Sequence, residues 1–346
     1  MGLPEKCEFS LDGNWRKGAK NLITDVPGVK VGHVTLCSGE INTGVTAVLP
    51  HDGNLFLDKV MASASVLNGF GKSTGLMQIG ELGAIETPII MTNTLSVGTA
   101  FSGLAKYMLA QNADIGVTTG TVNCVVTECN DGILNDIRGM HVKEEHVFQA
   151  IEAADAIFEE GAVGAGTGMY CLGVKGGIGS SSRIVPVDGK EYAVGALVMS
   201  NFGVPGNLVI GGERVGRKIK AVKAAEKDQG SIIILIATDL PLSERQLKRT
   251  ANRAAVSLAR TGSFMGSDSG DVAIAFTTAN RIPHYSETNL LEMKMFYDEN
   301  IDMVFEASVE AVEEAIISSL YHARSLTGVR GRTIRGLRDF IEKGLF

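Results

Sequence analysis

The stretch Ser231-Ile-Ile-Ile-Leu-Ile-Ala237 is a continuous apolar run of strand length. It is far too short to span a bilayer and indicates a buried strand. A helix follows over Ser243–Arg260, opened by Asp239-Leu-Pro-Leu-Ser243 and carrying apolar residues at helical spacing. A second apolar segment, Asp271–Thr278, comes after the helix and predicts another strand. This order of elements indicates a mixed α/β fold.

The rest of the chain continues the same alternation of short strands and helices. Strands are predicted over 22–35, 43–49, Thr87–Met91, Ile115–Thr119 and Ala193–Ser200, and helices over Val97–Asn112, Lys143–Glu160, Asp302–Ala323 and Gly336–Lys343. The strands are rich in Ala, Gly and Val, which suits sheets packed against other layers rather than facing water. No repeat, low-complexity stretch or linker divides the sequence, so we expect one domain over residues 1–346.

Composition narrows the class of protein further. The chain has 346 residues, with 32 basic and 39 acidic side chains and a formal net charge of −7. No basic block occurs, which disfavours binding to nucleic acid or to an anionic membrane. The N-terminus lacks the pattern of a signal peptide, and the odd count of five cysteines fits reduced thiols. We therefore expect a cytoplasmic protein.

Two motifs come close to cofactor or metal sites without matching them. Phe70-Gly-Lys-Ser-Thr74 is similar to a phosphate loop, but the pattern needs a glycine where Val66 stands. Cys124, Cys129, His141 and His146 approach a zinc-finger spacing, although the cysteines flank an apolar pair and His146 lies in a predicted helix. We expect neither a cofactor nor a metal, and a zinc-binding module stays a distant alternative.

The junction Thr261-Gly262-Ser263 is the strongest candidate for a reactive site in the sequence. One interpretation is structural: Gly262 ends the helix as its C′ glycine and Ser263 is a turn residue. The other is chemical, because the Ser263 hydroxyl could attack the unshielded Gly262 carbonyl and shift the chain to an ester. Hydrolysis would leave an N-terminal serine, whose α-amine has a pKa of roughly 7.7–8.0 and can act as the base for its own hydroxyl.

The whole sequence, including this junction, resembles the DmpA-like L-aminopeptidase/D-esterase peptidases, to which the β-peptidyl aminopeptidases are related. The matching motifs run in family order along nearly the whole chain. They are Asn21-x-Ile-Thr-Asp-Val-Pro-Gly-Val-x-Val-Gly-His33, Gly69-x-Gly-Lys-Ser-Thr-Gly75, Leu134-Asn-Asp-Ile-Arg-Gly139, Gly164-Ala-Gly-Thr-Gly168, Lys175-Gly-Gly-Ile-Gly179, Ser200-Asn-Phe-Gly203, Ala237-Thr-Asp-x-Pro-Leu242, Ala259-Arg-Thr-Gly-Ser263, Ala279-Asn280 and Glu313-Glu-Ala-Ile316.

The resemblance implies a four-layer αββα sandwich like that of N-terminal-nucleophile hydrolases. It implies self-cleavage into an α chain of residues 1–262 and a β chain of residues 263–346. Family members remove N-terminal residues from short peptides, amino-acid amides or esters without a metal. They assemble as homo-oligomers of the αβ unit.

Roles follow for individual residues where the motifs match. The resemblance implies that Ser263 is the nucleophile and that Asn201 is the oxyanion-hole amide, a donor of the kind that acyl transfer requires. It implies that Glu128 holds the free amine of the substrate. Glu314, with Glu313 as the second candidate, would be the carboxylate that supports the nucleophile.

Some positions depart from the family or allow another interpretation. Val312 stands where relatives often carry Ser or Thr, and Asn130 where an aromatic residue is common. From spacing alone, Glu310, Glu313 and Glu314 predict a solvated helix face. Two other functions stay open: an acyltransferase like the ornithine acetyltransferases, whose nucleophile is a threonine, and a non-catalytic protein that keeps the fold.

Overall fold

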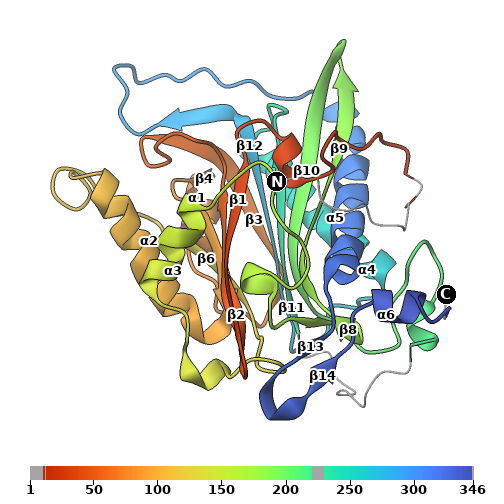
Figure 1. Ribbon diagram of the computed structural model, residues 1–346. Coiled ribbons are helices and arrows are strands. Elements are labelled where there is room, and N and C mark those ends of the chain that lie inside the picture. Colours follow the sequence, from red (N-terminus) through yellow and green to blue (C-terminus); the bar gives the residue numbers. More distant parts are fainter. Residues whose placement is uncertain (1–10, 12, 220–229, 345–346) are drawn as a thin grey trace.

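The computed structural model describes residues 11, 13–219 and 230–344 and is built around two sheets (Figure 1). The smaller sheet has the strand order β1 (Lys30–Ser38), β2 (Ile41–Leu49), β5 (Ile89–Asn93) and β6 (Val125–Cys129). The larger has the order β4 (Ala84–Ile85), β3 (Asp58–Gly69), β12 (Gly270–Pro283), β11 (Ser231–Thr238), β10 (Lys190–Asn201) and β9 (Gly177–Val187). Two small hairpins join β7 (Tyr170–Cys171) to β8 (Val174–Lys175) and β13 (Leu326–Thr327) to β14 (Thr333–Ile334).

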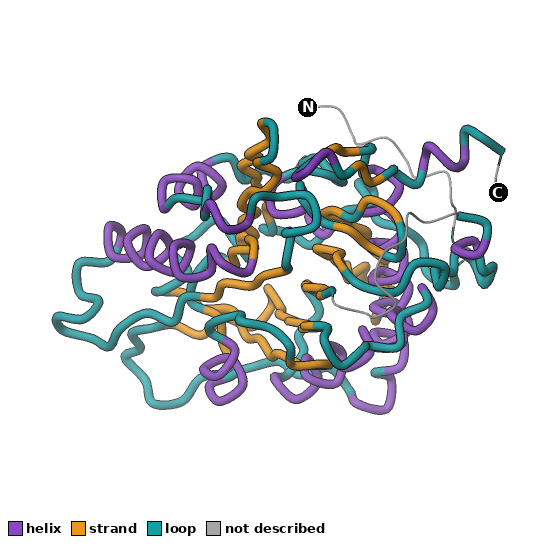
Figure 2. Tube along the Cα trace, turned by 90° about the horizontal axis from the view of Figure 1, so that it is seen from below, coloured by secondary structure: helices purple, strands orange, loops and turns teal. Residues whose placement is uncertain are grey.

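Helices cover the outer face of each sheet. The helices are α1 (Leu76–Leu82), α2 (Val97–Gln111), α3 (Glu144–Glu152), α4 (Glu244–Thr261), α5 (Asp302–His322) and α6 (Arg338–Ile341). One apolar cluster joins α4 and α5 to the larger sheet, a second lies between the sheets, and a third joins α2 and α3 to the smaller sheet. Figure 2 shows the strands at the centre and helices around them. The expected αββα sandwich is confirmed.

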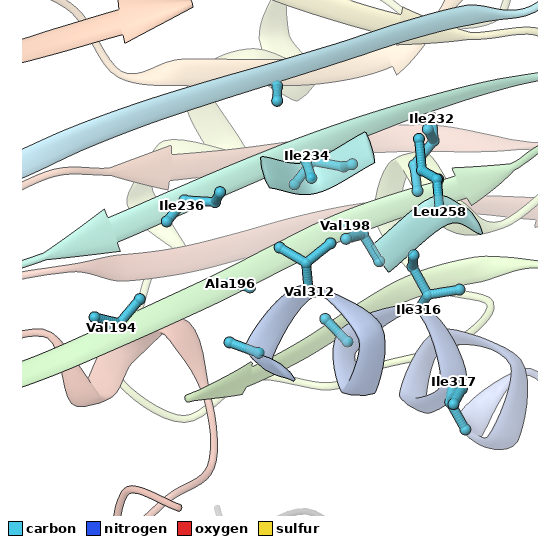
Figure 3. Packing of buried hydrophobic residues seen from close by; sticks show 14 of the residues in the cluster. Val194, Ala196, Val198, Ile232, Ile234, Ile236, Leu258, Val312, Ile316 and Ile317 are labelled. Carbon is cyan, nitrogen blue, oxygen red and sulfur yellow. The ribbon is translucent and has the colours of Figure 1, made fainter. Parts of the chain in front are cut away.

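Strand β11 shows why the central run of isoleucines folds this way. All eight of its residues are buried, and successive side chains point to opposite faces. Ile232, Ile234 and Ile236 pack toward α4 and α5 beside Val198 and Val312, as Figure 3 shows, whereas Ile233 and Leu235 pack between the sheets. A strand covered on both faces needs apolar residues at every position, which the sequence supplies.

Three sequence expectations are corrected by the structure. The predicted strand Ile115–Thr119 is a turn, in which the backbone amides of Val117, Thr118 and Thr119 all donate to the Asp114 carbonyl. The helix predicted over Lys143–Glu160 ends at Glu152, because Asp155 forms a bridge with Val31 of β1. The strand predicted over 22–35 starts only at Lys30, after a 3-10 turn at Ile23–Asp25.

No helix in the described part of the chain is both long enough and apolar enough to cross a membrane.

Candidate active site

The predicted nucleophile Ser263 lies in the turn that ends helix α4. Gly262 caps this helix with a φ of 104°, and a Cβ at this position would lie 1.9 Å from the Asn207 carbonyl oxygen. The Ser263 amide donates to the Leu258 carbonyl (2.9 Å), and its hydroxyl accepts from the Met265 amide (3.0 Å). The helix-ending role of Gly262 is therefore confirmed.

Three strands of the larger sheet meet next to this turn. Asn201 is the last residue of β10 and pairs in register with Ser231, the first residue of β11. Ser231 pairs in turn with Gly270, the first residue of β12. The strand ends thus lie side by side, about 5 Å apart from one strand to the next. The segment of residues 262–270, called here the serine loop, leads from α4 into this edge.

Glu128 reaches the same edge from the smaller sheet. It lies in β6, is 2% exposed, and accepts hydrogen bonds from the Lys72 amide (2.8 Å) and the Thr94 hydroxyl. A Cβ at Gly71 would lie 3.7 Å from Glu128 Oε1 and 3.8 Å from the Gly270 Cα. These two atoms, both within 4 Å of one point, are therefore no more than about 7.5 Å apart.

Ser269, which sequence analysis passed over, is the residue before Gly270, whose Cα lies within about 7.5 Å of this carboxylate. Its side chain is fully buried, and its hydroxyl donates to Asp271 Oδ1 at 2.6 Å. Its carbonyl accepts from the Phe70 amide, so the serine loop and Glu128 hold the same short segment, 70–72. The signal that could have found it is the Ser269-Gly270 pair immediately before the predicted strand Asp271–Thr278.

The Asn201 side chain is held in a fixed orientation at the edge. Its Oδ1 accepts from the Tyr170 amide (2.9 Å), and its Nδ2 donates to the Asn130 carbonyl (3.0 Å). An amide nitrogen carries two hydrogens, so Nδ2 can make a second donation toward a ligand. The Asn130 position thus supports Asn201 through its backbone.

Glu313 and Glu314 are not joined to the serine loop by any hydrogen bond or ion pair of the described residues. Glu314 contacts Arg183 (2.7 Å) and Lys17 (2.7 Å), and Glu313 contacts Arg260 (3.1 Å). Arg183 pairs in register with Val194, seven residues before Asn201. That separation is roughly 20 Å along a strand. Glu314 is therefore held by Arg183 and Lys17, whereas α5 itself continues toward the edge that holds Asn201, where Ser319 contacts Ser200 (2.6 Å).

The expected solvated helix face is wrong for two of its three glutamates. Glu310 and Glu314 are buried, and both contact the fully buried Arg183 of β9. Val312, on the same helix, packs in the core against the larger sheet (Figure 3). Helix α5 is buried between β9 and α4, so it lacks the polar outer face that the spacing suggested.

Electrostatics support the closeness of the two acids at the edge. The pKa of the Cys129 thiol is raised well above its ordinary value by burial and by the negative charges of Glu128 and Asp271. In the described ranges no three His, Cys, Asp or Glu side chains are grouped to hold a metal ion. The four residues at zinc-finger spacing are thus not brought together.

An αββα sandwich with a buried carboxylate, a side-chain amide and buried serines at one edge defines a hydrolase. The model of Peptidase family S58 matches residues 21–334, and the chain belongs to this family. The chain is 40% identical to beta-peptidyl aminopeptidase BapA of Sphingosinicella microcystinivorans, over 96% of this chain and 89% of that protein.

Two solved structures are similar along their whole length. The PH0078 protein of Pyrococcus horikoshii OT3 is 55% identical, with a TM-score of 0.92 and coverage of 96% of this chain and 95% of that one. The L-aminopeptidase D-Ala-esterase/amidase of Ochrobactrum anthropi is 35% identical, with a TM-score of 0.88 and coverage of 96% and 97%. That protein is described as a prototype for the serine aminopeptidases and a variant of the Ntn hydrolase fold.

Proposed function

We propose that this chain is a self-processing serine aminopeptidase that releases the N-terminal residue of short peptides, amino-acid amides or esters. The observation that carries the proposal is the buried Glu128 carboxylate, no more than about 7.5 Å from the Gly270 Cα at the end of the serine loop. A carboxylate at that distance can pair with a substrate's ammonium group while a neighbouring serine reaches the adjacent carbonyl. The family match favours this activity over acyl transfer and over a non-catalytic protein.

The geometry supports Ser269, rather than Ser263, as the nucleophile. Ser269 precedes the residue that lies beside Glu128, and its hydroxyl already donates to a carboxylate. Ser263 is bonded within its own turn, through the Leu258 carbonyl and the Met265 amide. An activated nucleophile needs an adjacent base, which Asp271 can supply to Ser269. The cleaved bond would then be Asp268–Ser269, with a β chain of residues 269–346.

Self-processing follows as an acyl shift within the chain. The Ser269 hydroxyl loses its proton to Asp271 and attacks the Asp268 carbonyl carbon. The carbon–nitrogen bond breaks, the nitrogen takes up a proton, and an ester remains. Water then hydrolyses this ester, which leaves the Asp268 carboxylate and an N-terminal Ser269 with its hydroxyl restored. The new α-amine, with an ordinary pKa near 8, can serve as the base in later turnovers.

Peptide hydrolysis would use the same edge of the sheet. Glu128 pairs with the substrate ammonium, and Ser269 attacks the carbonyl carbon next to it. Asn201 Nδ2 donates to the oxyanion as it forms, while the amine product leaves with a proton. Water attacks the resulting ester and releases the amino acid. A substrate without a free amine would lack its partner at Glu128.

A matched pair of variants tests this assignment. Ser269→Ala should leave the chain intact and abolish release of N-terminal residues from an aminoacyl p-nitroanilide. Ser263→Ala should still be cleaved and active, since among the described residues the Ser263 hydroxyl is bonded to the Met265 amide alone. If Ser263→Ala were uncleaved and inactive and Ser269→Ala were cleaved and active, the nucleophile would be Ser263. Activity in both variants would end the serine mechanism.

We propose that the αβ units assemble as a homo-oligomer in the cytoplasm. Large apolar side chains are exposed between β12 and α5, namely Tyr285, Leu290, Leu291, Met295 and Tyr297. Exposed apolar groups of this size are typical of protein contact surfaces. Sedimentation velocity should give a mass above one αβ unit, and Leu290→Lys with Met295→Lys should lower it. Cell fractionation checks the location.

A further inference from the structure

Lys175 is a fully buried lysine at the end of the hairpin β7–β8. Its Nζ donates to the carbonyl oxygens of Gly166 (3.1 Å), Met169 (2.8 Å) and Gly176 (2.5 Å). An ammonium group has three hydrogens, and here each has an acceptor. Burying a charge is costly unless it is hydrogen-bonded. The site is thus built to hold a cation on backbone dipoles alone, since the described residues give Lys175 no ion-pair partner within 4 Å.

One of these carbonyls belongs to a peptide group that also contacts the candidate active site. The Met169–Tyr170 peptide accepts from Lys175 through its oxygen and donates to Asn201 Oδ1 through its N–H (2.9 Å). The two bonds therefore lie in series across one resonance-stabilised amide. Hydrogen bonds in series polarise one another and strengthen the next donor along the chain.

We propose that Lys175 is a positioning residue that orients and polarises the Asn201 amide through the Met169–Tyr170 peptide group. The inference rests on the proposed function, in which Asn201 Nδ2 stabilises the oxyanion. The cation draws electron density from the peptide, so its N–H pulls harder on Asn201 Oδ1. The Nδ2 hydrogens then carry more positive charge, and the bond to the Asn130 carbonyl keeps them aimed.

The opposing charge that acts most strongly on Lys175 belongs to Asp131, which is also fully buried. Asp131 Oδ1 accepts from Asn135 (3.0 Å), and its backbone follows Asn130, the second partner of Asn201. Asp131 and Lys175 thus lie on the two segments that hold the Asn201 side chain. Burial lowers the pKa of Lys175 to about 7, although the negative charge of Asp131 opposes this shift.

A double-mutant cycle tests the inference. Lys175→Met should lower kcat about tenfold with little change in KM, less than the roughly 10²- to 10³-fold loss expected when an oxyanion donor is removed by Asn201→Ala. In the Asn201→Ala background, Lys175→Met should have no further effect, because its influence passes through that amide. The substrate is the aminoacyl p-nitroanilide that the wild-type enzyme cleaves fastest, and rates are normalised to processed chain.

Other variants separate this role from a structural one. Lys59→Met removes a mostly buried lysine that donates to the Phe56 carbonyl, and it should lower the melting temperature without changing kcat. Lys175→Gln keeps two hydrogens without the charge and should fall between wild type and Lys175→Met. If a variant processes itself too slowly to yield active enzyme, the rate of self-cleavage of its precursor is compared in place of kcat.

Two results overturn the inference while the proposed function stands. One is an equal loss from Lys175→Met in both Asn201 backgrounds. The other is failure of both Lys175 variants to fold, which assigns the lysine to stability alone. Failure of the proposed function looks different, because Asn201→Ala by itself would then leave kcat unchanged.

Discussion

In the proposed mechanism, Glu128 is the residue that would distinguish an aminopeptidase from an esterase that accepts any acyl group. Glu128→Gln keeps the size of the side chain and removes the charge that a substrate ammonium would meet. Losing one partner of a buried charge pair costs about 2–5 kcal/mol, so kcat/KM should fall by about 30-fold or more. Steady-state kinetics on aminoacyl p-nitroanilides measures the loss.

A second buried glutamate provides the control. Glu86 also accepts a backbone hydrogen bond, from Asn123 (2.8 Å), but it lies in the region of Lys59 and Gln78. Glu86→Gln should leave kcat/KM within a few-fold of wild type. Equal losses in both variants would deny Glu128 a special role.

Arg183 tests whether Glu314 serves stability or catalysis. Arg183→Met leaves two buried carboxylates, Glu310 and Glu314, without their guanidinium partner. Breaking a buried pair in this way should lower the free energy of unfolding by about 3–5 kcal/mol. Urea unfolding should be measured in the uncleaved Ser269→Ala background, where the chain stays in one piece.

The matched variant is Arg16→Met, whose partner Glu191 is exposed, as is Arg16 itself. It should change the free energy of unfolding by no more than about 1 kcal/mol. For activity, Arg183→Met is made with Ser269 intact. The folded fraction of this variant should keep the kcat of the wild type. A large loss of kcat without loss of stability would indicate that Glu314 takes part in catalysis.

For individual residues, the sequence indicates which side chains could be reactive but not which side chains they contact. The Gly262-Ser263 pair stood out because glycine before serine suits an acyl shift, yet the same pair is how a helix ends. The Ser269-Gly270 pair before a strand is a common pattern and does not by itself mark Ser269 as reactive. Its significance comes from Glu128, 141 positions earlier in the sequence and in the other sheet. Contacts between sheets cannot be deduced from one strand's sequence.

Among the elements, β9 and α5 depend on glycine for their close approach. A Cβ at Gly179 would lie 2.0 Å from the Ala315 carbonyl and 2.4 Å from the Ser319 amide. Gly179→Ala should therefore lower the free energy of unfolding by at least about 1–3 kcal/mol, as overpacking does. Urea unfolding in the Ser269→Ala background gives the value.

Gly80 in α1 is the contrasting glycine, because nothing lies within 4 Å of its Cβ position. Gly80→Ala should raise stability by about 0.5–1 kcal/mol through helix propensity. If Gly179→Ala were equally harmless, β9 and α5 would not pack as closely as described.

Elements with a clear period could be predicted, and those made by packing could not. Helices α2, α4 and α5 start and end within a residue or two of the predicted limits. Strand β9, Gly-Ile-Gly-Ser-Ser-Ser-Arg-Ile-Val-Pro-Val, was missed because its serines and glycines resemble a loop. It is a strand because small residues allow α5 to lie on it.

At the scale of the whole molecule, His33 makes stability depend on pH. Burial lowers its pKa from 6.5 to about 4, and the Glu159 carbonyl opposes this only in part. The unfolded chain therefore binds a proton first as the pH falls. Stability from this group is complete above about pH 6.5 and is lost toward pH 4, by up to about 2 kcal/mol at pH 5. Urea unfolding at pH 7 and pH 5 measures it.

The variant His33→Gln isolates this contribution from others. Burial raises the pKa of Asp131 to about 7, so that group stabilises the fold more as the pH falls and opposes His33. The difference between wild type and His33→Gln cancels the Asp131 contribution. The free energy of unfolding should fall less between pH 7 and pH 5 in His33→Gln than in the wild type. An equal fall in both proteins would contradict the lowered pKa of His33.

In the proposed mechanism, a serine at the edge where both sheets meet cleaves its own chain and then serves as the nucleophile. N-terminal sequencing of the small fragment from purified protein tests this most directly. We predict the sequence Ser-Gly-Asp-Val, which begins at Ser269. The sequence Ser-Phe-Met-Gly would place the cut before Ser263 and contradict the assignment of Ser269. A single intact chain after long incubation would contradict self-processing altogether.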